Sequence, residues 1–182
     1  MTRISALLVI DMQRVAFDDK ITPSITNGEQ LLERVALFIS LCRREGIRIV
    51  YIQTCGVSGQ PYAKDVHGWE IHPQLTPHSS DRIIYKQHSS GFDDTDLEEI
   101  LHCIGINSLI TCGIWSEHCV TKTSLDAMRR GFEVFVAADA HGTVADSEDG
   151  SNAIIAQQNS KLSKNGISVL PISDLEKMFL IS

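Results

Sequence analysis

The feature of this chain that most constrains its fold is a repeated alternation between short apolar runs and longer amphipathic segments. Residues 5–10 form a nearly continuous apolar run, and apolar side chains at helical spacing follow from Leu31 to Cys42, before Gly46. A continuous apolar run is typical of a strand that is covered on both faces. The start of the chain therefore predicts a buried strand followed by a helix.

The same alternation continues to the end of the chain. Further strands are expected at residues 47–53, 82–86, 108–114, 133–138 and, more weakly, 167–170. Further helices are expected from a capping-box-like pattern at residues 95–98 and over residues 119–130, 152–164 and 174–180. Residues 54–81 show no clear helix and are interpreted as a binding loop. Because parallel neighbours need crossover connections, this order predicts an α/β fold with helices on both faces of a mostly parallel sheet.

Composition limits the organisation and the partners of the chain. The 182 residues are 43% hydrophobic and contain no linker-like stretch, which favours one domain over residues 1–182. A net charge of -7 disfavours nucleic acids and anionic membranes as partners and favours a small molecule. Five cysteines without a CxxC pair favour reduced thiols. With neither a signal-like start nor a membrane-length apolar run, a cytoplasmic location is expected.

Three chemically reactive residues come just after predicted strands: Asp11, Lys86 and Cys119. Ligands of open α/β sheets bind beyond the carboxyl ends of the strands, so these residues are candidates for one site. A carboxylate accepts a thiol proton, an ammonium stabilises the resulting negative charge, and a helix start favours the thiolate. The alternatives are that Cys119 packs as a small hydrophobe, that Asp11 is a cap and that Lys86 is a solvated strand end.

Beyond these three residues, the chain resembles the isochorismatase-like cysteine hydrolase family, in its amidohydrolase branch. The resemblance is carried, in the family's order, by residues 8–13, 68–75, 86, 90–92, 95–97, 113–123, 126–127, 131 and 139–141. It implies a doubly wound, six-stranded parallel sheet in the order 3-2-1-4-5-6 and a catalytic triad of Asp11, Lys86 and Cys119. The implied reaction is hydrolysis of an amide, imide or urea-type C–N bond in a small molecule through a thioester acyl-enzyme.

The resemblance also implies several finer features. The backbone N–H groups of Trp115 and Cys119 would form the oxyanion hole, with a cis peptide bond between Ile114 and Trp115. Phe17, Trp69 and Trp115 are the expected pocket residues, although Trp115 stands where smaller or amide-bearing residues are usual in the family. A homo-oligomer is expected, and the apolar tail at residues 178–181 offers a surface for it. No cofactor is expected.

A metal site is not expected. Nicotinamidase members of the family carry an Asp-x-His metal pair after the second strand, where this chain has Gln53-Thr54-Cys55. His67, His72, His78 and His88 match no standard zinc spacing. His141 is interpreted as a residue behind the site, an interface residue or the cap of the next loop.

Two other functions remain as alternatives. One is a degenerate family member that binds a ligand or a protein without turnover; the intact triad favours an active enzyme instead. The other is hydrolysis of the vinyl ether of isochorismate. Members with that activity lack the cysteine, so Cys119 argues against it.

Overall fold

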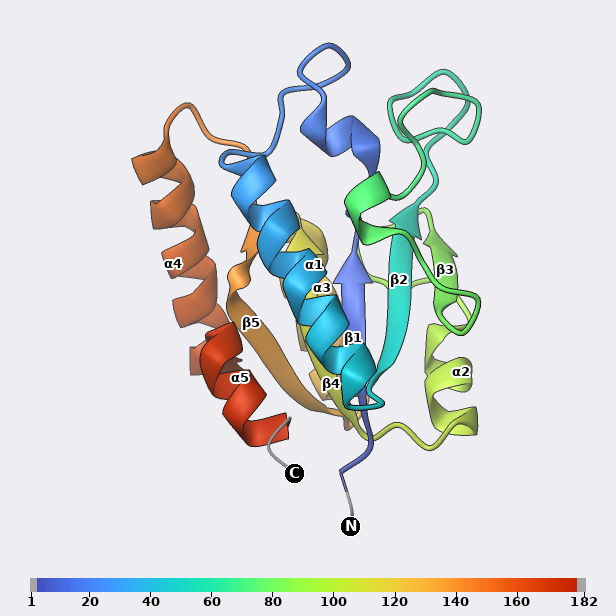
Figure 1. The fold of residues 1–182 in the computed structure, drawn as a ribbon, viewed down its shortest axis with the longest axis vertical. Helices are drawn as coiled ribbons and strands as arrows, with labels where there is room; N and C mark the ends of the chain where they lie inside the picture. The colour runs from blue at the N-terminus through green and yellow to red at the C-terminus, as the bar shows by residue number, and fades with distance from the viewer. Residues whose placement is uncertain (1–2, 180–182) are drawn as a thin grey trace.

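The predicted alternation of strands and helices forms one parallel sheet in a computed structural model, which describes residues 3–179 (Figure 1). Its six strands are β1 (Ser5–Ile10), β2 (Arg48–Thr54), β3 (Arg82–Lys86), β4 (Ser108–Ile114), β5 (Glu133–Gly142) and β6 (Ser168–Leu170). They pair in the order β3-β2-β1-β4-β5-β6, and every pairing is parallel. The expected order 3-2-1-4-5-6 is therefore confirmed.

Helices cover both faces of the sheet. They are α1 (Gly28–Arg44), α2 (Leu97–Cys103), α3 (Thr121–Arg129), α4 (Glu148–Lys164) and α5 (Ile172–Phe179), with short helical turns at Arg14–Phe17, Pro73–Leu75 and Ser116–Val120. Side chains of β1 alternate between two apolar clusters: Leu7 packs with α1 and α5, and Leu8 packs with α2, α3 and α4. Burial of one such leucine side chain stabilises the folded state by roughly 1.5–3 kcal/mol, so the helices on both faces of the sheet contribute to its stability.

The carboxyl ends of the strands meet at one edge of the molecule. In Figure 1 the arrows of β1, β2 and β3 point to the top, where the segments after β1 and β2 form large loops, and the described chain begins and ends at the bottom. This is the edge at which open α/β sheets bind their ligands. No helix within residues 3–179 has the length and apolar character to cross a membrane.

Several element boundaries differ from the sequence-based prediction. α4 begins at Glu148 rather than at residue 152, because the side chain of Ser147 accepts a hydrogen bond from the N–H of Gly150. The predicted capping box at residues 95–98 does not form, since Glu98 bonds Arg130 instead (3.0 Å). The last helix begins at Ile172, before the predicted residue 174.

The C-terminal tail lies only partly within the described residues. Phe179 packs edge-on against Phe135 of β5, with their ring centroids 4.9 Å apart, and Met178 is half exposed. Residues 180 and 181, which belong to the surface predicted for oligomer formation, lie outside the described range.

An irregularity in β5 shapes the edge of the sheet near the predicted site. Thr111 of β4 pairs with Val136, but Gly113 pairs with His141, so two steps along β4 match five steps along β5. Gly113 has φ +114°, and a Cβ there would lie 2.2 Å from the carbonyl oxygen of Ile10. Only glycine fits this close approach of β4 to β1.

Candidate active site

The structure brings Asp11, Lys86 and Cys119 together at the carboxyl edge of the sheet. Lys86 Nζ lies 2.8 Å from Asp11 Oδ2 and donates a hydrogen bond to Cys119 Sγ at 3.3 Å. Asp11, Lys86 and Cys119 are only 1%, 2% and 8% exposed. Three residues far apart in the sequence thus share one buried, water-poor site, where electrostatic interactions are strong.

The local backbone directs each of these side chains. Asp11 follows β1 with φ +53°, a left-handed conformation that aspartate tolerates better than most residues. Its N–H donates to the carbonyl of Ile52 at 2.8 Å, which joins the turn to the end of β2. Lys86 is the last residue of β3. Left-handed backbone conformations such as that of Asp11 cost energy and are frequent at functional sites.

Cys119 lies in a π-helical turn rather than at the start of an α-helix. The turn covers Ser116–Val120, and α3 begins only at Thr121, so the predicted helix over residues 119–130 is wrong at its start. Val120 and His118 both donate their N–H groups to the carbonyl of Trp115, at 3.1 Å each. π-Helical turns of this kind are rare and are frequent at functional sites.

Lys86 remains charged despite its burial. Desolvation lowers the pKa of Lys86, but Asp11 and Cys119 together raise it by more than desolvation lowers it. The pKa of Lys86 therefore lies above its usual value. The ammonium also donates to Thr54 Oγ1 (2.8 Å) and to the carbonyl of His88 (3.1 Å). Buried ammonium groups need such partners to remain ionised.

Thr54 belongs to this site, although sequence reasoning did not single it out. Its hydroxyl accepts from Lys86 and donates to Asp11 Oδ1 at 2.9 Å, so it bridges the two charges. The signal was its position at the end of β2, directly beside the ends of β1 and β3. Its side chain holds the carboxylate in place.

The expectation that the helix start favours a thiolate at Cys119 is wrong for the resting site. Burial raises the pKa of the Cys119 thiol to about 12, and Asp11 acts in the same direction, while Lys86 opposes them. The reason is that Cys119 lies in a desolvated turn packed against the sheet and beside a carboxylate. The thiol is therefore neutral at rest and needs a base to take its proton.

Trp115 stands at the junction between β4 and the turn that carries Cys119. The peptide bond between Ile114 and Trp115 is cis. The indole is half-buried and packs against both apolar clusters of the protein. Trp115 therefore lies between the sheet and the loops at its carboxyl edge.

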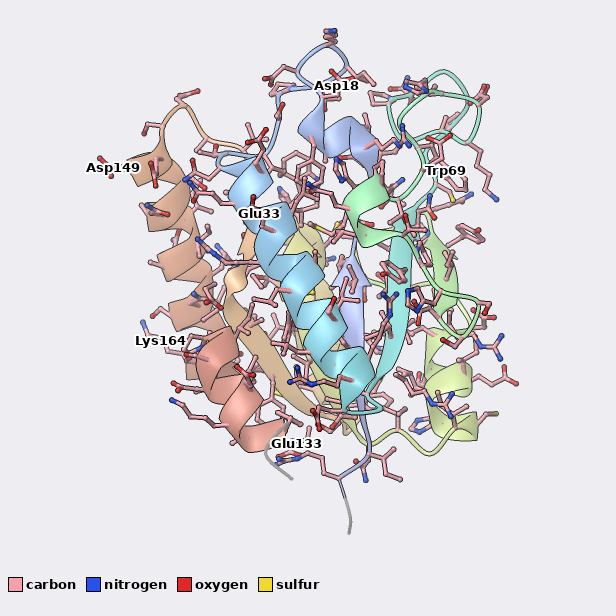
Figure 2. The ribbon with its side chains drawn as sticks, viewed as in Figure 1. Asp18, Glu33, Trp69, Glu133, Asp149 and Lys164 are labelled. Atoms are coloured by element: carbon pink, nitrogen blue, oxygen red, sulfur yellow. The ribbon has the colours of Figure 1, made fainter. Side chains whose placement is uncertain are left out.

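Trp69 fixes the loop after β2 to the end of that strand. Its indole N–H donates to the carbonyl of Thr54 at 3.0 Å, and its own carbonyl accepts from the amides of Gln13 (2.7 Å) and Gln53 (2.8 Å). Its ring stacks on Tyr85, with centroids 5.7 Å apart. Figure 2 shows Trp69 beside the loops above the end of β2.

Phe17, the third predicted pocket residue, packs elsewhere. Its ring meets His72 edge-on, with centroids 5.4 Å apart. It lines a cavity of about 540 Å³ together with His72, Gln74 and residues of α1, and no member of the triad lines that cavity. The structure therefore places Phe17 at a hollow that none of Asp11, Lys86 and Cys119 lines.

Tyr62, from the loop after β2, is a site residue that sequence reasoning missed. Its hydroxyl is buried next to the Trp115 side chain, and its O–H has no acceptor among the described residues. Burial raises the pKa of Tyr62, and Asp11 and Cys119 raise it further, while the contact of its hydroxyl with the Trp115 side chain opposes them. The hydroxyl thus stays protonated beside the triad, as a free hydrogen-bond donor. Its loop has no motif that would have revealed it.

The residues near the site do not fit a metal ion. Within residues 3–179 no three His, Cys, Asp or Glu side chains lie close enough together to hold one. At the end of β2, the Gln53 amide donates to the carbonyl of Trp69 and the Thr54 hydroxyl joins Lys86 to Asp11, so neither residue supplies the carboxylate or imidazole that a zinc site prefers. His88 lies at the surface beside Asp94 (3.1 Å), and His72 packs on Phe17.

His141 lies behind the turn that carries Cys119 and does not cap the next loop. It is 2% exposed, and its Nδ1 and Nε2 atoms lie 2.8 Å from Ser116 Oγ and Asn159 Oδ1. Burial lowers the pKa of His141, so the ring is neutral. Of the three interpretations from the sequence, a residue behind the site agrees with this placement.

Comparisons with known proteins agree with this architecture. The model of the Isochorismatase domain matches residues 5–163. A streptothricin hydrolase of Streptomyces noursei is 32% identical over 140 residues, which cover 77% of this chain and 55% of that protein. Nicotinamidase 3 of Arabidopsis thaliana is 30% identical over 158 residues, which cover 78% of this chain and 75% of that protein. This chain thus spans little more than half of the length of the streptothricin hydrolase.

A solved structure shows the same fold. The crystal structure of a putative isochorismatase hydrolase from Oleispira antarctica superposes with a TM-score of 0.87 and is 25% identical. The superposition covers 96% of this chain and 98% of the other. The fold is therefore shared over nearly the whole length of both chains.

Proposed function

The chain belongs to the isochorismatase-like hydrolase family, and from this membership we propose that it hydrolyses an amide-type C–N bond in a small molecule with Cys119 as nucleophile. The observation that carries the proposal is the buried contact of one ammonium, that of Lys86, with both the Asp11 carboxylate and the Cys119 sulfur. The relationship to a nicotinamidase supports amide chemistry.

In the first half of the proposed reaction, Asp11 takes the proton of the Cys119 thiol as the sulfur attacks the substrate carbonyl carbon. A neutral resting thiol makes this transfer necessary, because a free thiolate is not available. The oxyanion is held by the backbone N–H groups of Trp115 and Cys119. The C–N bond then breaks, Asp11 returns its proton to the leaving nitrogen, and a thioester remains on Cys119.

In the second half, water hydrolyses the thioester. Asp11 takes a proton from the water as its oxygen attacks, and that proton passes to the departing sulfur, which restores the thiol and releases a carboxylic acid. Lys86 stabilises whichever of Asp11 and Cys119 carries negative charge at each step, because it contacts both. Asp11 thus starts and ends each cycle ionised.

The proposed substrate is small and amide-, imide- or urea-like. Tyr62 and Trp115 are proposed to line its pocket, because the Tyr62 hydroxyl is buried near the triad and next to the Trp115 side chain, with no acceptor for its O–H. Trp69, which holds the loop after β2 to its strand, is proposed as a pocket wall. We also propose that the protein is cytoplasmic, forms a homo-oligomer and needs no cofactor.

The test is hydrolysis of a panel of small amides, imides and ureas, followed by ammonia release for primary amides and ureas and by formation of the ring-opened or cleaved acid for imides. The wild-type protein is expected to act on at least one of them, Cys119→Ala to lose all turnover, and Asp11→Asn to lose nearly all. Cys103→Ala is the matched control, because Cys103 is an exposed thiol at the end of α2. Turnover by Cys119→Ala would contradict the covalent mechanism. Absence of turnover by the wild type across the panel, with ligand binding retained, would favour the non-catalytic alternative.

A further inference from the structure

A line of buried hydrogen bonds connects the turn that carries Cys119 to helix α4. Ser116 Oγ lies 2.8 Å from His141 Nδ1, and His141 Nε2 lies 2.8 Å from Asn159 Oδ1. Ser116 and His141 are 0% and 2% exposed. None of these three residues contacts substrate in the reaction above, so their burial and bonding need another explanation.

The direction of these hydrogen bonds follows from the other contacts of Asn159. Asn159 Nδ2 donates to the carbonyl of Ala138 at 3.1 Å, which leaves Asn159 Oδ1 as the acceptor that faces His141. His141 Nε2 must then carry the ring proton, and Nδ1 accepts from the Ser116 hydroxyl. Each polar side-chain atom in the line thus has a partner when His141 is neutral.

The surroundings of His141 favour that neutral form. Burial lowers the pKa of His141, and the hydrogen bond to Asn159 and the carboxylates of Asp139 and Glu117 only partly oppose this effect. Arg34 and Glu148 line a small cavity of about 90 Å³ on another side of the ring. The ring therefore serves as a fixed hydrogen-bonding bridge.

A second set of contacts to Ser116 involves Thr121, the first residue of α3, and Gln158 of α4. Thr121 Oγ donates to the backbone carbonyl of Ser116 at 2.6 Å and lies 3.2 Å from Gln158 Oε1. The carbonyl of Ser116 is thus held by the first residue of α3, while its side chain is joined to α4 through His141 and Asn159. Ser116 is the first residue of the turn, and Cys119 follows three residues later.

The long irregularity in β5 makes this arrangement possible. It places His141 directly opposite Gly113 of β4, two residues before Trp115, instead of further along the strand. Arg34 of α1 holds the irregular segment by donating to the carbonyl of Asp139 (2.8 Å), and Asp139 Oδ1 accepts from Ile172 of α5 (2.9 Å). The bridge between α4 and the turn therefore rests on a fixed backbone.

We propose that Ser116, His141 and Asn159 form a positioning relay that fixes the Cys119 turn to α4 and so sets the position of the nucleophile relative to Lys86 and Asp11. These are positioning residues, since none touches the reacting atoms. The kinetic part of this inference rests on the proposed cysteine hydrolase function. A displacement of a reacting group by about 1 Å costs up to roughly a hundredfold in rate.

The kinetic test is a double-variant cycle with Ser116→Ala and Asn159→Ala. Each single variant is expected to lower kcat about tenfold or more and to leave KM within about twofold, because substrate contacts are untouched. The double variant should lose little more than the worse single variant, since both changes break one relay. Ser108→Ala is the control: Ser108 is a buried serine at the opposite end of β4 and should leave kcat unchanged. If the kcat losses of the two single variants multiply in the double variant, or if only KM changes, the relay proposal is overturned.

Two readouts are independent of turnover. Nitrogen NMR of the histidine rings is expected to show His141 as the neutral Nε2–H form; an Nδ1–H form would overturn the proposal. The rate of Cys119 alkylation by iodoacetamide should fall about tenfold in both single variants, because the sulfur loses its place beside Lys86. An unchanged or faster rate would overturn it. If the wild type hydrolyses no amide, the proposed function fails while these readouts still decide the relay.

Discussion

Replacement of Lys86 by methionine tests whether the buried ion pair governs the stability of the site. Lys86 and Asp11 lie 2.8 Å apart, and both side chains are 1% exposed. Methionine keeps the length of the stem but leaves the Asp11 carboxylate buried without an opposite charge. Breaking a buried pair from one side costs about 3–5 kcal/mol.

Urea unfolding followed by tryptophan fluorescence measures this cost. With a denaturant dependence of roughly 2 kcal/mol per molar urea, the midpoint should fall by about 1.5–2.5 M. The matched control is Lys177→Met, because Lys177 and Asp174 are also 2.8 Å apart but are 68% and 47% exposed. That change should leave the midpoint within experimental error, since exposed ion pairs contribute little.

The double variant Asp11→Asn/Lys86→Met separates the loss of the whole ion pair from the loss of one charge. Removing both charges leaves no unpaired buried ion, so the double variant should be more stable than Lys86→Met alone and should remain inactive. Thr54 can still donate its hydroxyl hydrogen to the amide oxygen of Asn at position 11. Additive losses in the double variant, or a Lys86→Met midpoint equal to that of Lys177→Met, would refute the account of the pair.

Four further outcomes are expected. The rate of Cys119 alkylation by iodoacetamide should rise steadily from about pH 7 to about pH 10, because the thiol pKa is about 12 and the thiolate fraction grows about tenfold per pH unit below it; a plateau near neutral pH would contradict this. Tyr62→Phe should raise KM about tenfold with kcat little changed, whereas Tyr51→Phe, whose buried hydroxyl faces Arg43, should leave KM unchanged; equal KM values in the two variants would remove Tyr62 from the pocket. Prolonged treatment with a strong chelator should not lower activity, and restoration of lost activity by zinc would show that the protein does use a metal ion. Light scattering should give a mass above that of one chain, and a monomer at working concentration would exclude the proposed oligomer.

The sequence by itself determined which segments form the strands of the sheet and which residues follow them. The apolar runs and helical periodicities marked all six strands, because a strand buried on both faces has to be apolar along its length. The positions of Asp11, Lys86 and Cys119 just beyond strand ends were also readable, since parallel strands place their carboxyl ends at one edge. The order of the strands came from the family resemblance rather than from periodicity, which does not encode lateral neighbours.

Only the tertiary structure decided the chemical state of the site and its supports. The raised pKa of Cys119 depends on desolvation by side chains from other elements, so a rule based on the local helix start gave the wrong sign. Thr54 and Tyr62 stand beside the triad because β2 lies next to β1 and because the loop after β2 folds back over the strand ends. His141 faces Ser116 only because β5 is out of register beyond Val136. Such contacts join residues far apart in the chain, and local sequence patterns carry no information about them.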